Sequence, residues 1–301
     1  MQKIDRNLQR TERVEKTSER MDKIKESVEK LLPLELEDAQ KYLSEESIKT
    51  NQFRDLYGKE VVNRDNNLVT RLKQDFAENH KKILPNGINF EQLKQLSDVT
   101  EAYLLRGFNE GKWIPHCNGI KTSDYDDYVN GVDMVLEYDN ADSPARHIGL
   151  GVDVTFASNV EDKLAKIKRE IETGALTSIK YFDSPNSHFR GELKKVPRAV
   201  AGFDIDSIRR LARLRQTGGE LPENDPLRFV ALHQLDMQMK TFSEYASKKS
   251  LPSQEVLSRT SKFITLLYSF VKQNNHYDPE LVEKNVQVKH FAKTLRSFSD
   301  L

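Results

Sequence analysis

Two aspartates interrupt runs of residues that are otherwise apolar. Asp133 lies in Gly-Val-Asp-Met-Val-Leu and Asp153 in Leu-Gly-Val-Asp-Val-Thr-Phe. In the interior of a sheet an unpaired carboxylate costs several kcal/mol or takes up a proton, so both groups need a compensating partner. If the two runs form neighbouring antiparallel strands, both aspartates can point to the same face, where their charges would repel.

A divalent cation would relieve this repulsion. Mg²⁺ and Mn²⁺ prefer oxygen ligands, retain several waters and need only one or two protein carboxylates. The surrounding segment is acidic, since residues 123–156 contain eight Asp and Glu and one basic residue, Arg146, for a local charge of −7. We therefore expect Asp133 and Asp153 to bind Mg²⁺ or Mn²⁺. The alternative is that each aspartate bonds to backbone amides or to a nearby Lys or Arg.

The middle of the chain is predicted to be mixed α and β. Apolar residues recur at helical spacing from Phe90 to about Phe108. Residues 132–138 and 147–156 are then expected to form a strand hairpin, followed by a helix over 160–173 that ends at Gly174. Further along the chain, the expected elements are strands over 178–182 and 196–203 and a helix that begins at Asp204.

This order of a helix, a hairpin with an Asp on each strand, a helix and a strand resembles the PD-(D/E)XK, or restriction-endonuclease-like, nuclease superfamily. The resemblance covers about residues 90–203. It implies that Asp133 and Asp153 bind the catalytic metal. In that family a Lys two residues after the second acid orients the attacking water, but Thr155 occupies this position here. The chain is thus similar to a divergent member of the superfamily.

Members of this family can supply the missing ammonium group from the next helix. The resemblance therefore implies a role for a lysine in 160–173, and Lys166 is preferred over Lys163 because it directly precedes the core-facing Ile167. The family often adds a Glu on the first helix, for which Glu101 and Glu110 are available.

The leading functional hypothesis is a Mg²⁺- or Mn²⁺-dependent endonuclease that hydrolyses phosphodiester bonds in DNA. A metal at Asp133 and Asp153 would polarise a phosphoryl oxygen and lower the pKa of its water, while a lysine would position that water. The alternative is a catalytically inactive nuclease-fold module that binds nucleic acid or a protein partner. Whether the chain is an enzyme depends on where a lysine amine lies relative to Asp153.

A basic region follows the hairpin. Residues 160–215 contain 13 Lys and Arg against eight Asp and Glu, a balance of +5. A phosphate backbone could lie across these side chains, and the predicted contacts are Arg209, Arg210, Arg213, Lys194, Lys195 and Arg198. The alternative is a solvated surface whose charges form ion pairs.

The predicted fold is α+β, with a central mixed sheet and flanking helices between helical N- and C-terminal regions. Residues 1–84 are expected to be helical, with a break near Gly58, and 1–32 carry a short heptad seam that could form a coiled coil and a homodimer. The nuclease-like core is predicted over 90–216. Residues 227–301 are expected to be helical, in segments of about 227–249, 253–273 and 279–298.

Composition narrows the class of protein further. The 47 basic and 47 acidic side chains cancel, so any attraction of a polyanion must be local. Cys117 is the only cysteine, which excludes an intramolecular disulfide and a thiolate-based zinc site. The first 30 residues show no signal-peptide pattern and no run is long enough to span a membrane, so we expect a cytoplasmic protein without a membrane partner. Walker A, GxGxxG, HExxH and GxSxG motifs are absent.

Overall fold

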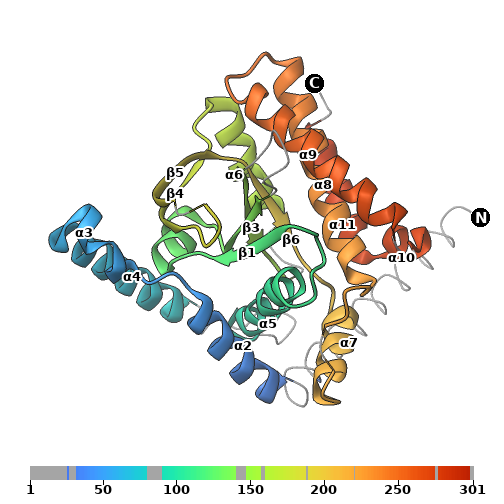
Figure 1. Ribbon diagram of the computed structural model, residues 1–301, viewed down its shortest axis with the longest axis horizontal. Coiled ribbons are helices and arrows are strands. Elements are labelled where there is room, and N and C mark those ends of the chain that lie inside the picture. The colour runs from blue at the N-terminus through green and yellow to red at the C-terminus, as the bar shows by residue number, and fades with distance from the viewer. Residues whose placement is uncertain are drawn as a thin grey trace, which may run out of the picture.

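A four-stranded mixed sheet lies at the centre of the molecule (Figure 1). The computed structural model describes residues 26, 32–79, 90–139, 147–156, 160–187, 189–219, 221–274 and 277–298. The strands are β1 (Cys117–Lys121), β2 (Met134–Asp139), β3 (His147–Val154) and β6 (Arg198–Ala201), and they lie in this order. β2 pairs antiparallel with β1 and β3, whereas β3 and β6 are parallel. The described chain is thus an α+β fold, as predicted.

A long crossover joins the parallel strands β3 and β6. It contains helix α6 (Val160–Thr173) and a separate hairpin of β4 (Thr177–Asp183) and β5 (Arg190–Val196). Parallel neighbours require such a connection because the chain must return to the same end of the sheet. The sequence pattern identified β2, β3, β4 and β6 but missed β1 and β5. The missed strands, Cys-Asn-Gly-Ile-Lys and Arg-Gly-Glu-Leu-Lys-Lys-Val, are poor in the apolar alternation that marks a strand.

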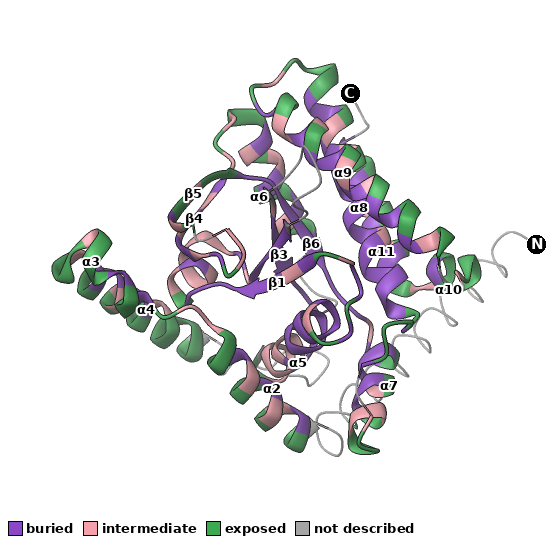
Figure 2. Cartoon of the chain, viewed as in Figure 1, coloured by how far each residue is buried: buried purple, intermediate pink, exposed green. Residues whose placement is uncertain are grey.

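The two faces of the central sheet are covered differently. One face presents Met134, Leu136, Leu150 and Val152 to the large core, to which helices α5 (Phe90–Asn109) and α8 (Leu227–Lys248) contribute. On the other face, Val135 packs with Ile179, Phe182 and Val196 of the β4–β5 hairpin. The strands are therefore buried on both sides (Figure 2), which explains why their apolar runs are nearly continuous.

The N-terminal region is helical but more broken than the sequence predicts. It comprises α2 (Leu32–Glu46), the 3₁₀ turn η2 (Thr50–Phe53), α3 (Arg54–Tyr57) and α4 (Lys59–Asn79). The predicted break at Gly58 is confirmed, since this residue adopts a φ of 81° between α3 and α4. The predicted coiled coil over 1–32 lies outside the described residues except for Glu26 and Leu32.

The C-terminal helices belong to the same hydrophobic core as the sheet. They are α7 (Ile205–Gln216), α8, α9 (Gln254–Gln273), α10 (Pro279–Lys284) and α11 (Val286–Leu295), and one cluster of buried side chains extends from Ala39 to Phe298. The expected helix over 279–298 is divided at Asn285, whose side chain accepts from two amides at the start of α11. In Figure 1, α8, α9 and α11 lie together on one side of the molecule.

Two buried glutamines of α8 bond to the backbone of β6 and the loop after it. Gln238 accepts from the amide of Val200 at 2.9 Å and donates to its carbonyl at 2.6 Å, and Gln234 makes the same pair of bonds to Gly202 at 3.0 and 2.9 Å. β6 is an edge strand of the described sheet, so its outward N–H and C=O groups would otherwise lack partners. The helix thereby closes this edge.

The cysteine offers a test of the packing near β1. Cys117 is 5% exposed, and burial together with the charge of Glu137 raises the pKa of its thiol to about 12. We expect the native protein to react with a thiol reagent at pH 8 at least about 100-fold more slowly than the urea-unfolded chain, because the thiolate is the nucleophile. Equal labelling rates with and without urea would contradict this packing.

No helix of the described chain is long and apolar enough to cross a membrane.

Candidate functional site

Asp133 and Asp153 lie beside each other at one end of the sheet. Met134 pairs with Val152 in the antiparallel register of β2 and β3, so Asp133, one residue earlier, lies opposite Asp153. The amide of Asp133 donates to the carbonyl of Val152 at 3.0 Å, and its carboxylate Oδ2 accepts from the amide of Val154 at 2.5 Å. The two strands are thus antiparallel neighbours, as the sequence analysis expected.

The lysine that contacts Asp153 is Lys163. Its Nζ forms an ion pair with Asp153 Oδ1 and donates to the carbonyl of Val154 at 2.6 Å. Lys166, which was preferred from the sequence, instead donates to the carbonyl of Asn130 at 3.1 Å on the surface. The first turn of α6 therefore brings Lys163, and not Lys166, to the aspartates. Thr155 lines the adjoining cavity.

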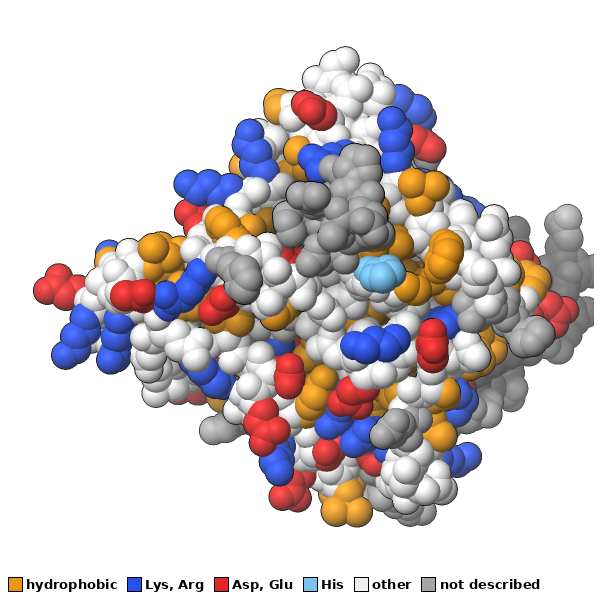
Figure 3. Space-filling view, viewed as in Figure 1, with side chains coloured by type: hydrophobic (Ala, Val, Ile, Leu, Met, Phe, Trp, Pro, Cys, Tyr) orange, Lys and Arg blue, Asp and Glu red, His pale blue; other side chains and the backbone are white. Residues whose placement is uncertain are grey.

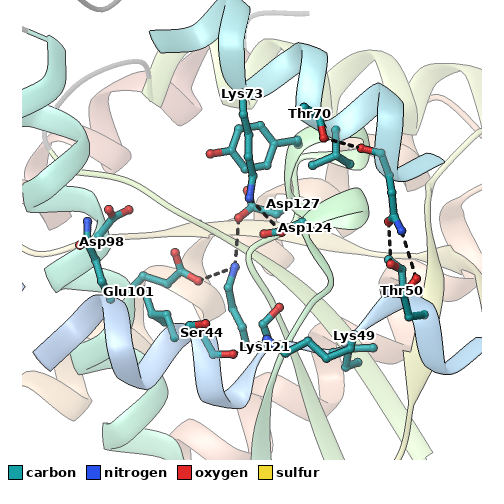
Figure 4. Close-up of a pocket in the computed structure, with 18 of the residues that line it drawn as sticks. Ser44, Lys49, Thr50, Thr70, Lys73, Asp98, Glu101, Lys121, Asp124 and Asp127 are labelled. Atoms are coloured by element: carbon teal, nitrogen blue, oxygen red, sulfur yellow. Dashed lines mark hydrogen bonds and ion pairs between the residues drawn. The ribbon is translucent and has the colours of Figure 1, made fainter. Parts of the chain in front are cut away.

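A second lysine, from β1, lies between two further carboxylates (Figure 4). Lys121 Nζ is 2.8 Å from Glu101 Oε1 on α5 and 3.1 Å from Asp127 Oδ2, and its side chain is only 7% exposed. Asp127 in turn shares a side-chain hydrogen bond with Asp133. Glu101, predicted from the sequence, thus belongs to this cluster, whereas Glu110 lies 3.6 Å from Arg106 at the far end of α5.

We call Glu101, Lys121, Asp127, Asp133, Asp153 and Lys163 the acid–lysine cluster. It contains four carboxyl and two amino groups, so fully ionised it carries a charge of −2. Burial and the charges of Asp127 and Glu101 raise the pKa of Asp133 well above its usual value. Burial would also raise the pKa of Asp127, but the charges of Lys121 and Lys94 and the hydrogen bonds from Asp133 and Lys121 together outweigh it and lower this pKa. Burial likewise raises the pKa of Glu101, so the surplus of negative charge is unfavourable without a cation.

Burial alone would lower the pKa of both lysines of the acid–lysine cluster. The charges of Asp127 and Glu101 overcome this effect and raise the pKa of Lys121 well above its usual value. For Lys163, the charges of Asp153 and Asp133 and the hydrogen bond to Asp153 together overcome burial and raise the pKa. In contrast, burial and the charge of Arg198 lower the pKa of Lys166. Both amino groups of the acid–lysine cluster therefore remain positively charged at neutral pH.

The acid–lysine cluster opens onto two cavities that share part of their walls. A cavity of about 410 Å³ is lined by Asp133, Asp153, Lys163 and the aromatic ring of Tyr128. A second cavity of about 520 Å³ lies between α2, α4, α5 and β1. Both are lined by four common residues, Lys94, Glu101, Asp127 and Tyr128. Solvent and a ligand can therefore approach the aspartates from the side of the N-terminal helices.

The π-helical turn η3 (Asp126–Asn130) positions Asp127. The buried Asp126 accepts from the amides of Lys180 and Tyr181 at 2.7 and 3.0 Å, which fastens this turn to β4. Gly131 then ends the turn with a φ of 71°, and Thr122 Oγ1 donates to the carbonyl of Val132 at 2.5 Å. The chain therefore enters β2 at a defined position, which places Asp133 beside Asp127.

Of the six predicted phosphate contacts, Arg209, Arg210 and Arg213 of α7 line one small cavity with Asp206, but the other three are not brought to them. Arg198 is 2% exposed and bonds internally to Glu170 at 2.7 Å and to the carbonyls of Asn130 and Gly131, so it supports the loop before Asp133 and does not lie on a nucleic-acid surface. Arg209 is 3.1 Å from Glu26, and Arg210 pairs with Asp225. Both arginines, which were predicted to contact phosphate, are therefore paired with a carboxylate of the same chain.

The remaining basic residues are exposed but lie on separate elements. Arg213 is on α7, whereas Lys194, 3.5 Å from Glu192, and Lys195 are on β5. Figure 1 places α7 and β5 on different sides of the molecule. On the described part of the face in Figure 3, basic and acidic side chains are interspersed. A phosphate backbone therefore cannot contact these predicted residues as one continuous patch.

Sequence reasoning missed Lys121, Asp127, Lys94 and Tyr128. Lys94 forms an ion pair with Asp98 at 2.6 Å, and the charges of Asp98 and Asp127 overcome burial and raise its pKa. The one available signal was the acidic segment that begins at Asp124, three residues after Lys121. The sequence does not show which of these acids point inward. Asp124 is exposed, whereas Asp126 is buried and accepts a hydrogen bond from the amide of Lys180.

The residues present fit a divalent cation by charge and by ligand type. The surplus of two negative charges in the acid–lysine cluster would be compensated by such an ion, and carboxylates are the ligands that Mg²⁺ and Mn²⁺ prefer. Among the described residues, no group of three or more His, Cys, Asp and Glu has the arrangement of a complete metal site. Asp133 and Asp153 would thus be two ligands, with water or substrate oxygens as the others.

Comparisons with protein-family models, with curated proteins and with solved structures find no match for this chain.

Proposed function

We propose that the protein is a metal-dependent nuclease that hydrolyses phosphodiester bonds, with DNA as its substrate. The observation that carries the proposal is the pair of Asp133 and Asp153, adjacent across two strands, which line an open cavity together with the ammonium group of Lys163. A pair of carboxylates, a cation site and a positive side chain at one cavity are the components of metal-assisted phosphoryl chemistry.

The arrangement of the elements supports the proposal. Helix α5 precedes the antiparallel strands β1, β2 and β3, helix α6 follows, and β6 adds in parallel to β3. This is the order that the resemblance to the PD-(D/E)XK superfamily implies, with the β4–β5 hairpin inserted before the last strand. Glu101 on α5, Asp133 before β2 and Asp153 on β3 then occupy the three acidic positions of that resemblance.

Each residue of the acid–lysine cluster has a defined task in this proposal. Asp133 and Asp153 would hold a Mg²⁺ or Mn²⁺ ion, which supplies Lewis acidity toward water and a phosphoryl oxygen. Lys163 replaces the lysine that Thr155 cannot provide, and its charge offsets negative charge that develops on the phosphate. Lys121 holds Glu101 and Asp127 in place and keeps Asp127 ionised beside Asp133.

A second candidate function is a non-catalytic module that binds nucleic acid or a protein. The observation in its favour is that the site carboxylates already have partners within the chain: Asp153 pairs with Lys163, and Asp133 accepts from the amide of Val154. A buried acid with such partners can serve stability alone. The two functions differ in whether a divalent cation binds and whether a phosphodiester is cut.

The proposed nuclease is tested by incubating the full chain with supercoiled plasmid and with single-stranded DNA. We expect nicked or shortened products in Mg²⁺ or Mn²⁺ and none in EDTA. Isothermal titration of Mn²⁺ into the protein provides a readout that is independent of turnover. Intact DNA in both metals, together with no heat of Mn²⁺ binding, would leave only the non-catalytic module.

The structure also predicts which lysine matters for activity. We expect Lys163→Met to lower the cleavage rate by about 100-fold, since removing a group that stabilises transition-state charge typically has this effect. Lys166→Met is the matched control on the same helix and should change the rate less than about threefold, because Lys166 contacts Asn130 instead of Asp153. A larger loss in Lys166→Met than in Lys163→Met would contradict the assignment.

A further inference from the structure

The cavity of about 520 Å³ beside the acid–lysine cluster is lined by uncharged polar side chains as well as ions. Its charged residues balance, because four lysines, Lys49, Lys73, Lys94 and Lys121, face four carboxylates, Asp98, Glu101, Asp124 and Asp127. Lys73 pairs with Asp124 at 2.8 Å and Lys94 with Asp98 at 2.6 Å. The rest of its polar wall includes amide and hydroxyl side chains, those of Gln40, Ser44, Ser47, Thr50, Asn51, Asn66 and Thr70. The portion of a ligand that occupies this cavity should therefore be polar and uncharged.

Two of these amides form a linked pair that faces the cavity. Asn66 Nδ2 donates to Asn51 Oδ1 at 3.3 Å, and Asn66 Oδ1 accepts from Thr50 Oγ1 at 2.7 Å (Figure 4 shows Thr50 and Thr70 on this wall). Asn51 is exposed and lines the cavity. Amide groups present a donor and an acceptor side by side, which matches the edge of a nucleobase.

An aromatic ring stands where the two cavities meet. Tyr128 lines both of them, and its ring is 5.2 Å from the ammonium of Lys73 and packs edge to face against Phe76 with ring centroids 6.3 Å apart. Tyrosine rings stack on nucleobases regardless of base identity, with a contribution of about 1–3 kcal/mol per base. A base beside the scissile phosphate would thus find a stacking partner at the entrance to the polar cavity.

From these contacts we propose that the cavity between α2, α4 and α5 binds an unpaired nucleotide next to the phosphodiester at Asp133 and Asp153. The assignment rests on the nuclease proposed above and specifies its substrate as single-stranded or frayed nucleic acid. A base within a duplex has its edge paired and both faces stacked, so it cannot offer its edge to Asn51 or its face to Tyr128. The base site and the phosphate site adjoin, because four residues line both cavities.

Binding can be measured without turnover by fluorescence anisotropy in Ca²⁺, with a gel to confirm that the probe stays intact. The probes are a labelled single strand of DNA of about 15 nucleotides, its blunt duplex and an RNA strand of the same sequence, which distinguishes the two sugars. We expect the single strand to bind at least about tenfold more tightly than the duplex. Tyr128→Ala should weaken single-strand binding about tenfold, and Asn51→Ala about threefold.

Phe270→Ala is the matched control, because Phe270 is an aromatic residue of α9 that is 52% exposed and lines neither cavity. It should bind every probe like the wild type, and thermal unfolding of each variant shows that it is folded. Equal affinity for single strand and duplex, or an unchanged affinity in Tyr128→Ala, overturns the inference even if the wild type cuts DNA. Tyr128-dependent binding of the single strand without any cleavage in Mg²⁺ or Mn²⁺ supports the cavity as a binding site and refutes the nuclease.

Discussion

Asp133→Asn and Asp153→Asn are each expected to lower metal-dependent DNA cleavage by at least about 100-fold, since even the outer-shell partners of metal ligands typically cost 10- to 100-fold when mutated. An amide retains the shape of the carboxyl group but removes the charge that would hold the cation. The measurement is the initial rate of product formation with Mg²⁺ and Mn²⁺ at several concentrations. Mn²⁺ binding by calorimetry should be lost in parallel.

The two substitutions should differ in their effect on stability. Burial and the charges of Asp127 and Glu101 raise the pKa of Asp133 well above its usual value, which means that the ionised carboxylate is unfavourable there. A neutral amide therefore removes little favourable interaction, and Asp133→Asn should unfold at nearly the wild-type urea concentration. Asp153→Asn removes the partner of Lys163 and is expected to be destabilised by about 1–3 kcal/mol. A folded Asp133→Asn without cleavage then separates chemistry from stability.

Asp162→Asn is the matched control for both variants. Asp162 is an exposed acid on α6, one residue before Lys163, and lines neither cavity. It should cleave DNA at the wild-type rate and bind Mn²⁺ equally well. If all three variants retain wild-type activity, Asp133 and Asp153 are not the ligands and the nuclease site must lie elsewhere.

Lys121→Met is expected to be the most destabilising single substitution in the acid–lysine cluster. The side chain of Lys121 is buried between Glu101 and Asp127, so its removal leaves two carboxylates without their compensating charge. Breaking a buried ion pair from one side typically costs about 3–5 kcal/mol. Urea unfolding followed by circular dichroism should show this loss in the free energy of unfolding at neutral pH.

Two further variants identify the cause of that loss. Lys73→Met removes a lysine whose partner Asp124 is more than half exposed, and it should cost less than about 1 kcal/mol. The double variant Lys121→Met/Glu101→Met should recover much of the lost stability, because an apolar pair replaces a broken ion pair. A Lys121→Met protein as stable as the wild type would show that Glu101 and Asp127 are solvated or protonated without the lysine.

Several features of the fold could be predicted because they depend on short stretches of chain. The apolar runs around Asp133 and Asp153 specify two strands, and the hairpin that joins them follows from their proximity in sequence. The breaks at Gly58 and before Pro279 are local effects of backbone geometry. β1 and β5 were missed because their side chains lack the alternation, and only pairing with β2 and β4 makes them strands.

The candidate site was predicted in part for the same reason. Its two aspartates stand out in apolar strands, but the choice between Lys163 and Lys166 depends on how α6 is rotated against the core. Leu164, Ile167 and Ile171 are the buried residues that set this rotation. The phosphate contacts predicted from basic residues could not be judged from the sequence. Arg198 pairs with Glu170 and Arg210 with Asp225, and a count of charges along the chain does not reveal these ion pairs.

The two acids that interrupt neighbouring apolar strands could be recognised from the order of residues alone, because strand periodicity and burial are encoded locally. The charges that surround the two acids, in contrast, depend on how distant elements pack. Glu101, Lys121 and Asp127 come from α5, β1 and η3, and they meet through packing that no local pattern specifies. Electrostatic compensation depends on distances of a few ångströms between such elements, so it becomes visible once the elements are placed in space.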